Sequence, residues 1–371
     1  MELTPGIATL MREMPDGYEN ACYETGAIVR KRDVKNPDDL MMLNLFHLMT
    51  GCSLVEISAI ASMAQIGEIS DVAFMKRFKN CNEWFKWIID KTVSQGLIEY
   101  NLPKTLDKYR VLALDASDVK EKGRSGRIFR LHFALDIKKM HAVLYNITTN
   151  HTGEKLSNFA LSQGDLVLGD RAYGSANGVD HCIKTGTEYI LRIQSNRPQM
   201  FDEQGNTINV LERISKSEIG DFSCFVKSGT KLLPTRVCFK KKSKEAIEAS
   251  KKLLKKKEYK HQMKFSDKAK AFNNYVVVIT SLGDEISPAD VLDAYRYRWQ
   301  VELYFKRLKS ILDYGELPKK TEDSIFAWLN GKLMIALLIE KLLGRATFSP
   351  TAESFEEYLA RGEDYEAAVI V

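Results

Sequence analysis

The spacing of apolar residues predicts that the first part of the chain is helical. Between residues 37 and 100, apolar residues recur three and four positions apart, which is the period of an amphipathic α-helix. Asp38 or Asp39 is placed to cap the first of these helices. We therefore expect helices before the first strand.

Two short helices are predicted within residues 53–80, one on either side of Gly67. Ser53 and Ser70 stand where the N-caps of these helices belong. The second helix ends in the basic residues Lys76, Arg77 and Lys79. Two helices around a glycine-containing turn are compatible with a helix-turn-helix that reads DNA, and equally with two helices that only pack together.

From residue 108 the pattern becomes that of strands, rich in β-branched, leucine and aromatic residues. Three antiparallel strands are predicted at residues 109–117, 127–137 and 141–149. A short helical segment follows, and then a strand, a helix and a strand at residues 165–170, 176–186 and 187–193. The predicted fold class is α/β, and this order of elements resembles that of a ribonuclease H-like domain.

The alternation is interrupted between residues 198 and 272, where turn signals, short strand-like runs and a lysine-rich helix predict a mostly β insertion. A strand returns after the insertion. Ser287 and Pro288 then open a long helix, which we expect to run unbroken to residue 312. A last apolar helix, residues 324–343, is expected to cover the sheet.

Composition narrows the class of protein without identifying it. The 371 residues exceed one typical domain, and the hydrophobic fraction of 44% is ordinary for a globular protein with a core. No apolar run is long enough to predict a membrane span or a secretory signal. The six cysteines lie far apart without a CxxC pair, which favours reduced thiols in a cytoplasmic protein over a zinc site or a disulfide framework.

The net charge of +5 is small, but its distribution is uneven. Residues 240–270 carry 13 lysines against four acids, a local net charge of +9. Such a run is either a solvated helix face or a patch that neutralises DNA phosphates. Beyond Pro350 the balance reverses, with six acids against Arg361.

Two of the predicted strands end in an aspartate, Asp115 after VLAL and Asp170 after LVLG. A strand buried on both faces has room for a carboxylate at its end, where the sheet opens to solvent. On neighbouring strands the two carboxylates meet at one rim, where their repulsion favours binding of Mg²⁺ or Mn²⁺. Each aspartate alone is also consistent with a turn or cap. Competing carboxylates are expected in a loop, near a turn and at a strand start: Asp118, Asp136 and Asp165.

The helix after Pro288 carries a polar stripe. At ~100° per residue, four side chains fall within an arc of about 60°: Tyr295, Arg298, Glu302 and Lys309. A glutamate among two cations and a tyrosine forms either an ion-paired surface or a face turned toward the two aspartates.

The spacing Tyr-x2-Arg-x3-Glu-x6-Lys from Tyr295 to Lys309 resembles the signature of the bacterial insertion-sequence transposase family numbered four. LALDAS around Asp115 resembles the segment that carries the first catalytic aspartate of that family, and LGDRAYGS around Asp170 resembles the second. The resemblance covers residues 40–345, with the motifs in the order of the family. It implies a DDE transposase whose ribonuclease H-like catalytic domain is interrupted by a mostly β insertion.

We accordingly expect a helical N-terminal DNA-binding region, a catalytic core in two parts, the insertion between these parts, and a C-terminal segment. In chain order, the N-terminal region, first core part, insertion, second core part and C-terminal segment are residues 1–105, 106–197, 198–272, 273–345 and 346–371.

The resemblance implies that Asp115, Asp170 and Glu302 form the catalytic triad and bind two Mg²⁺ or Mn²⁺ ions per active site. One site can then hydrolyse the phosphodiester at the end of the element and join that end to target DNA, which is cut-and-paste transposition. The side chains expected to bind DNA are Tyr295, Arg298, Trp299, Lys309 and Arg171.

The expected partners are double-stranded DNA, as terminal inverted repeats and as target, and a second copy of the chain in a paired-end complex. No membrane partner is expected. Trp299 is expected either to stack on an unstacked base or to lie in the core. Two other functions share these features: a nuclease that cuts without strand transfer, and a DNA-binding relative that has lost catalysis. The presence of all three acids argues against the last.

Overall fold

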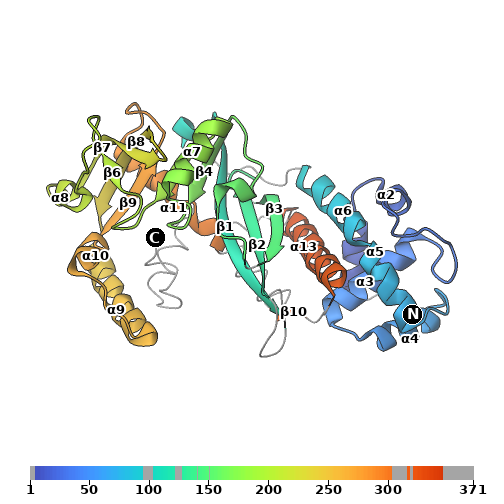
Figure 1. Cartoon of the computed structure of the whole chain (residues 1–371). Helices are drawn as coiled ribbons and strands as arrows, with labels where there is room; N and C mark the ends of the chain where they lie inside the picture. The colour runs from blue at the N-terminus through green and yellow to red at the C-terminus, as the bar shows by residue number, and fades with distance from the viewer. Residues whose placement is uncertain are drawn as a thin grey trace.

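The computed structural model describes residues 5–94, 103–121, 128–139, 141–149, 151–302, 316–317 and 321–345. In this part of the chain, one large β-sheet occupies the centre of the molecule (Figure 1). The N-terminal helices lie at one end, and the helices of the insertion lie at the other. No helix within the described ranges is long and apolar enough to cross a membrane.

The N-terminal region is helical, as predicted. Its helices are α1 (Pro5–Arg12), α2 (Tyr18–Glu24), α3 (Pro37–Thr50), α4 (Leu54–Met63), α5 (Asp71–Asn80) and α6 (Asn82–Ser94). Ser53 and Ser70 cap α4 and α5, since each hydroxyl accepts a hydrogen bond from the backbone N–H three residues later. The predicted cap of α3 is wrong. Its N-cap is Asn36, whose side chain accepts from the N–H of Asp39, while Asp38 lies in the first turn.

Five strands build the first part of the sheet after a short turn, η1 (Lys104–Leu106). They are β1 (Arg110–Glu121), β2 (Ile128–Asp136), β3 (His141–Thr149), β4 (Asp165–Gly169) and β5 (Glu188–Arg192). The first three are antiparallel, as predicted, while β4 pairs in parallel with β1 and with β5. Two helical segments flank β4: η2 (Leu156–Asn158) and α7 (Ala176–Thr185). The predicted α/β class is confirmed as a mixed sheet with helices.

The inserted segment extends this sheet. Its elements are β6 (Met200–Phe201), α8 (Val210–Ile214), β7 (Ile219–Ser228), β8 (Lys231–Lys241), α9 (Lys244–His261) and α10 (Asp267–Phe272). The chain returns through β9 (Tyr275–Thr280), which pairs with both β5 and β8. The strand order is β3-β2-β1-β4-β5-β9-β8-β7-β6, and the short strand β10 (Glu316–Leu317) pairs with β1. The expected β-rich insertion with a lysine-rich helix thus shares its sheet with the preceding strands.

Helix α13 (Glu322–Arg345) joins the N-terminal helices to the sheet. We expected it to cover the sheet. It does contact β3, but it packs mainly against α3, α5 and α6, between the sheet and the N-terminal helices (Figure 1). Ile325, Leu333 and Leu337 are at most 1% exposed, and one hydrophobic core continues from α1 through α13 to β1. The N-terminal region is therefore packed onto the sheet through α13.

Both faces of the central strands are buried, as their continuous apolar runs predict. Val111 and Ala113 of β1 lie in the core that includes α13 and α11 (Pro288–Arg296). Leu112 and Leu114 lie in the second core, which includes α7, β7 and β8. This alternation decides on which face each polar residue at the strand ends emerges.

Candidate active site

Three polar residues stand in one row where β4 and β5 end. Continuing the register of β1 with β4 past its last pair places Asp115 beside Asp170. Continuing the register of β4 with β5 in the same way places Asp170 beside Arg192. Asp115 and Arg192 follow the alternation of Ala113 and Ile190, which belong to the core that includes α11. The row therefore faces the segment that follows α11.

The prediction that a strand ends at Asp115 is wrong. β1 continues to Glu121, because β2 pairs along it as far as Lys120. The strand that ends is β4, whose last pair with β1 is formed at Ala113. Beyond that pair β1 has lost its neighbour β4, and Asp115 is partly exposed there.

Asp170 begins a tight turn between β4 and α7. Its backbone carbonyl accepts hydrogen bonds from the N–H groups of Tyr173 and Gly174, and its Oδ1 accepts one from Ala172 N–H at 2.8 Å. A Cβ on Gly174 would lie 1.9 Å from the carbonyl oxygen of Arg192. Only glycine allows this close approach, so the DRAYGS segment fixes Asp170 against the end of β5.

The helix that follows the insertion begins as predicted, with Ser287 as N-cap and Pro288 in the first turn. The prediction of one unbroken helix is wrong, because α11 ends at Arg296 and residues 297–298 form a turn. Around this turn, backbone N–H groups bond to carbonyls three residues earlier, which is 3₁₀ spacing, and helical residues resume at Trp299.

The polar residues around this turn point into the protein. Tyr295 and Arg298 are each 1% exposed, and Glu302 is half-buried. Arg298 Nη2 donates to Glu302 Oε1, so the ion pair suggested by their four-residue spacing is present. The Arg298 guanidinium lies 6.0 Å from the centroid of the Tyr295 ring. This stripe is therefore not a solvated surface. Lys309, the last residue of the stripe, lies outside the described residues.

The carboxylates of Asp115 and Glu302 both respond to Asp170. Burial raises the pKa of Asp115 to about 8; Arg298 opposes this rise, and Asp170 and Glu302 add to it. Burial also raises the pKa of Glu302, against the effect of Arg298 and with a further rise from Asp170. Carboxylates that disfavour one another's ionisation are stabilised in the charged form by a nearby cation.

Buried arginines lie beside the carboxylates. Arg192 is 1% exposed, and neither Nη1 nor Nη2 has a hydrogen-bond partner within the described chain. Burial, with the charges of Arg171 and Arg298, lowers the pKa of Arg192 to about 9. The Nε atoms of Arg171 and Arg298 and the hydroxyl of Tyr295 are also buried without a partner there. Buried donors without acceptors are unfavourable, so this cluster is suited to an anion such as a phosphate.

The other residues expected to bind DNA differ in their surroundings. Arg171 is half-buried beside Asp170 and Tyr295, and its Nη2 donates to Asn273 Oδ1 at 3.3 Å. Trp299, for which both base stacking and a core position were considered, is 3% exposed. The structure thus brings Arg171 and Tyr295 to the carboxylates and packs Trp299 inside the protein.

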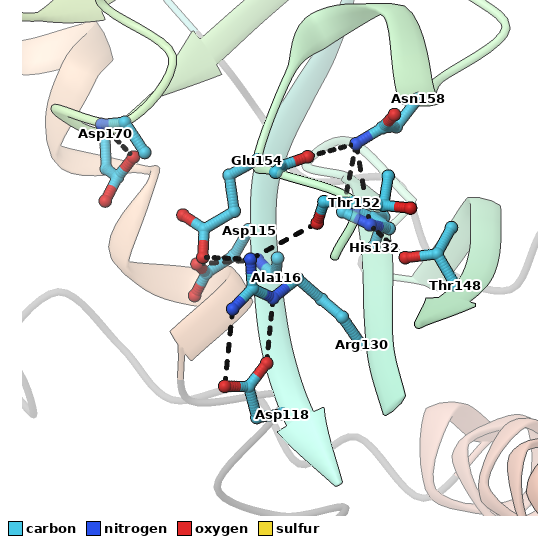
Figure 2. Close-up of polar contacts among 12 residues, drawn as sticks. Asp115, Ala116, Asp118, Arg130, His132, Thr148, Thr152, Glu154, Asn158 and Asp170 are labelled. Carbon is cyan, nitrogen blue, oxygen red and sulfur yellow. Dashed lines mark hydrogen bonds and ion pairs between the residues drawn. The ribbon is translucent and has the colours of Figure 1, made fainter. Parts of the chain in front are cut away.

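Sequence reasoning missed a polar network next to Asp115. Arg130 of β2 donates to Asp118 at 2.8 Å, and its Nη1 lies 3.9 Å from Glu154 (Figure 2). Asp118 therefore lies within β1 and is paired, rather than in a loop as predicted. Burial raises the pKa of Glu154, and Asp170 adds to this rise. Glu154 is thus a fourth acid at the site.

Tyr173 was also missed. Its ring is 1% exposed, and its hydroxyl has no hydrogen-bond partner in the described ranges. Burial raises its pKa, as do the nearby charges of Asp115, Glu154 and Asp170. The sequence contained signals for two missed residues, since Arg192 interrupts an apolar strand and Tyr173 lies in the DRAYGS segment. Arg130 and Glu154 carried no such signal.

The remaining competing aspartates have structural roles. Asp165 lies at the start of β4, as predicted, and pairs with Arg110 at 2.6 Å. Asp136 lies beside a turn, as predicted, and its Oδ1 accepts a hydrogen bond from Lys139 N–H at 3.1 Å. Neither side chain belongs to the row formed by Asp115 and Asp170.

The donor chemistry of the site fits a hard divalent cation. Asp115, Asp170 and Glu302 offer carboxylate oxygens alone, which Mg²⁺ and Mn²⁺ prefer, and their mutual repulsion is relieved by positive charge. As the side chains stand, no three His, Cys, Asp or Glu residues within the described ranges are grouped closely enough to hold one metal ion. Glu302 is turned to Arg298, so metal binding requires Glu302 to share or release this partner.

Known proteins resemble this chain over most of its length. Residues 106–338, more than half of the chain, match the model of the transposase DDE domain. The chain is 25% identical over 340 residues to the InsL protein of insertion sequence element IS186A of Escherichia coli (strain K12), whose name describes it as a transposase; the alignment covers 89% of this chain and 91% of the relative. Coverage and identity are the same for the transposase of insertion sequence element IS421 of Escherichia coli. The transposase of element IS231F of Bacillus thuringiensis subsp. israelensis is 26% identical, over 48% of this chain and 41% of the relative. The chain therefore belongs to the family of transposases with a DDE domain, enzymes that cleave DNA and transfer its strands.

Proposed function

We propose that this protein is a transposase of the bacterial insertion-sequence family numbered four, and that it moves an insertion sequence by cut-and-paste transposition. The observation that carries the proposal is the row of Asp115 and Asp170 beside Glu302, inside the matched DDE domain. The order β3-β2-β1-β4-β5, antiparallel and then parallel, supports a ribonuclease H-like core that residues 198–272 interrupt. The names of the relatives that match most of the chain support an insertion sequence as the mobile element.

DDE transposases generally use divalent metal ions. In this protein Asp115, Asp170 and Glu302 would hold two Mg²⁺ or Mn²⁺ ions, which supply activation of the attacking oxygen and stabilisation of the leaving oxygen. The raised pKa values of Asp115 and Glu302 support this assignment, because both acids gain from a nearby cation.

Each step breaks a phosphorus bond to a 3′-oxygen, first by hydrolysis and then by transesterification. At the end of the element, a water oxygen attacks phosphorus, the bond to the 3′-oxygen breaks, and that oxygen takes up a proton. In joining, the freed 3′-hydroxyl attacks a phosphodiester of the target DNA, and a target 3′-oxygen leaves. One set of carboxylates can serve both steps, since the bonds made and broken are of the same kind.

The buried arginines have a part in these steps. Arg192 and Arg171 offer donors that find no acceptor among the described residues, and we assign them, with Arg298, to the phosphates of the transferred strand. We assign the Tyr295 hydroxyl, which has no partner among the described residues, to donate to one of these phosphates, and we add Lys309 by its place in the motif. Trp299 is 3% exposed and follows Arg298 directly, and we assign it to support of the turn that carries Arg298.

Excision requires both ends of the element to be cut, and one such site acts on one end at a time. We therefore assign the protein to a paired-end complex of two subunits on terminal inverted repeats, with the helical N-terminal region recognising the repeats. The lysine-rich helix α9 is assigned to flanking phosphates. Light scattering with and without end DNA tests the assembly. Full strand transfer by one subunit per end would contradict it.

Strand-transfer assays test the catalytic assignment. The substrate is a duplex with the inverted repeat found beside the coding region, incubated with Mg²⁺. Asp115→Asn, Asp170→Asn and Glu302→Gln should each reduce cleavage by more than the roughly 100-fold that follows loss of a group that only orients a metal ligand. Asp284→Asn, at an exposed acid away from the row, serves as the control and should keep normal cleavage.

The same assay separates the alternatives. Cleavage without joining would identify a nuclease, and end binding without cleavage would identify a DNA-binding relative. Near-normal cleavage by one of the three variants would remove that residue from the proposed triad.

A further inference from the structure

A second cluster of positive charge lies in the N-terminal region, far from the lysine-rich helix. The loop between α2 and α3 reads VRKRDVK from Val29 to Lys35. Its cations are exposed, namely Arg30, Lys31, Arg32 and Lys35. Val34 is 0% exposed and anchors the loop in the core. The loop is thus tied at its centre while its cations face solvent.

The loop is fixed against the turn that joins α4 to α5. Arg77 of α5 donates from Nη2 to the carbonyl oxygen of Arg30 at 3.0 Å. A Cβ on Gly67 would lie 2.1 Å from the carbonyl oxygen of Asp33, so the turn and the loop touch backbone to backbone. The loop and α5 therefore form one surface.

Helix α5 presents two different faces. Phe74 and Phe78 are 0% exposed and bury one face in the core. Val72 and Lys76 are exposed on the opposite face, where Lys79 is half-buried. Val72 keeps 58% of its surface exposed, one helical turn before the exposed Lys76. A rigid helix with this outer face suits a partner that is anionic and also offers apolar groups.

Nearby acids form hydrogen bonds with groups other than these cations. Asp71 Oδ1 accepts a hydrogen bond from the N–H of Val72 within α5. Glu68 accepts a hydrogen bond from the Ser62 hydroxyl. The loop itself contains one acid, Asp33. We call the six cations together the basic face: Arg30, Lys31, Arg32, Lys35, Lys76 and Lys79.

We propose that the basic face is the site that binds the terminal repeat as duplex DNA, with α5 in the major groove and the Val29–Lys35 loop on the phosphates. The major groove admits an α-helix, and its thymine methyl groups are apolar contacts for an exposed valine. The flanking cations neutralise phosphates on either side. This inference rests on the proposed function and specifies which surface recognises the element.

The experiment measures binding of the full chain to labelled repeat duplex by fluorescence anisotropy, without metal, over a series of salt concentrations. The triple variant Arg30→Ala, Arg32→Ala and Lys35→Ala should reduce the log–log salt slope by roughly 2 to 3. Affinity at physiological salt should fall on the order of 100-fold, from loss of about fivefold per phosphate contact. Val72→Ala and Lys76→Ala should narrow the difference in affinity between the repeat and a scrambled duplex.

A matched triple variant at exposed lysines at the far end of the sheet, Lys216→Ala, Lys227→Ala and Lys231→Ala, removes the same charge and should keep both slope and specificity. Thermal unfolding checks that each variant is folded, and glutamine replacements at the loop positions serve if an alanine variant is not. The inference would be overturned by an unchanged salt slope and affinity in the loop variant, or by equal losses in the matched control. In either case, cleavage by the wild type would leave the proposed function standing. Absence of both repeat binding and cleavage in the wild type would overturn both.

Discussion

The carboxylate site and the basic face both use arginine, but in opposite environments. Arg298 and Arg192 are each 1% exposed and lie against carboxylates, whereas Arg30 and Arg32 are exposed on a surface loop. A buried guanidinium needs fixed partners, because desolvation is unfavourable unless hydrogen bonds compensate. An exposed one keeps its hydration and acts through released counterions. Buried arginines therefore fix a position, while exposed ones supply attraction.

This contrast predicts its largest effect at Arg298. Arg298→Ala should lower the free energy of unfolding by about 3–5 kcal/mol, because it leaves Glu302 half-buried without its cation. Urea denaturation measures this change. The double variant Arg298→Ala with Glu302→Gln is the control and should lose less than the sum of the single variants. Strict additivity would show that the ion pair does not stabilise the fold.

A smaller effect is expected on the pH dependence of stability, which should change at the carboxylate site and not at the basic face. The pKa of Asp115 is about 8 in the folded protein and about 4 in an unfolded chain. Between these values the folded state holds a proton that the unfolded state has released, so stability decreases as pH rises through this window. At pH 8 without metal, Asp115→Asn should be more stable than the wild type, on the order of 1–3 kcal/mol.

The difference should vanish below about pH 3, where the carboxyl is protonated in both states. Mg²⁺ should also reduce it in the wild type, since a bound cation favours the ionised carboxylate. Urea denaturation at several pH values, with Arg32→Ala as a control outside the site, measures both trends. A pH-independent difference between wild type and Asp115→Asn would contradict the perturbed pKa.

At the basic face, the close contact of Gly67 with the loop should matter more than any single cation. Gly67→Ala places a methyl group 2.1 Å from the Asp33 carbonyl oxygen and should cost about 1–3 kcal/mol of stability by overpacking. It should also weaken repeat binding, because the loop must move away from α5. Gly6→Ala, at a position with open space and outside the left-handed backbone region, controls for glycine replacement in general. Equal losses of stability and of repeat binding in the two variants would show that the contact between Gly67 and the loop is not important.

The smallest effect on stability is expected at Arg32. Arg32→Ala should change the free energy of unfolding by no more than about 0.5 kcal/mol, as for most exposed positions. Its affinity for the repeat should still fall about fivefold at physiological salt. Denaturation and anisotropy on the same sample test this separation of stability from binding. If Arg32→Ala lost as much stability as Arg298→Ala, the contrast between buried and exposed arginines would be wrong.

Most helix caps were predictable from the sequence, although the cap of α3 was assigned to the wrong residue. The caps at Ser53, Ser70 and Ser287 were correct because an N-cap depends on residues within one turn. The extent of β1 was not, since its length past Asp115 is set by pairing with β2, a choice made by a distant part of the chain. The same limit applies to the α11 break at residues 297–298, where burial of neighbouring side chains outweighs the regular helical period.

At the candidate site, too, local motifs predicted some residues, while others are brought together only by the fold. Asp115, Asp170 and Glu302 were predicted from motif spacing, and the register of β1 with β4, continued past its last pair, places the first two side by side. Arg192 was missed because a lone arginine in an apolar strand has no local meaning until β4 and Asp170 lie beside it. Glu154 and Arg130 come from a loop and from β2, and the fold alone brings them together.

Helix α13 lies between the N-terminal helices and the sheet, and its buried side chains belong to the core of both. If α5 reads the repeat, the base pairs it reads and the phosphate cut at the carboxylates are held at a fixed separation and a fixed rotation about the duplex axis. The protein then accepts only one spacing between the repeat and the cleavage position. Half a turn of DNA, about five base pairs, inserted between the two positions would carry the phosphate to the wrong side of the duplex. Such an element could be bound but not cut. The packing of α13 would determine the permitted spacing between the recognised base pairs and the cut phosphate.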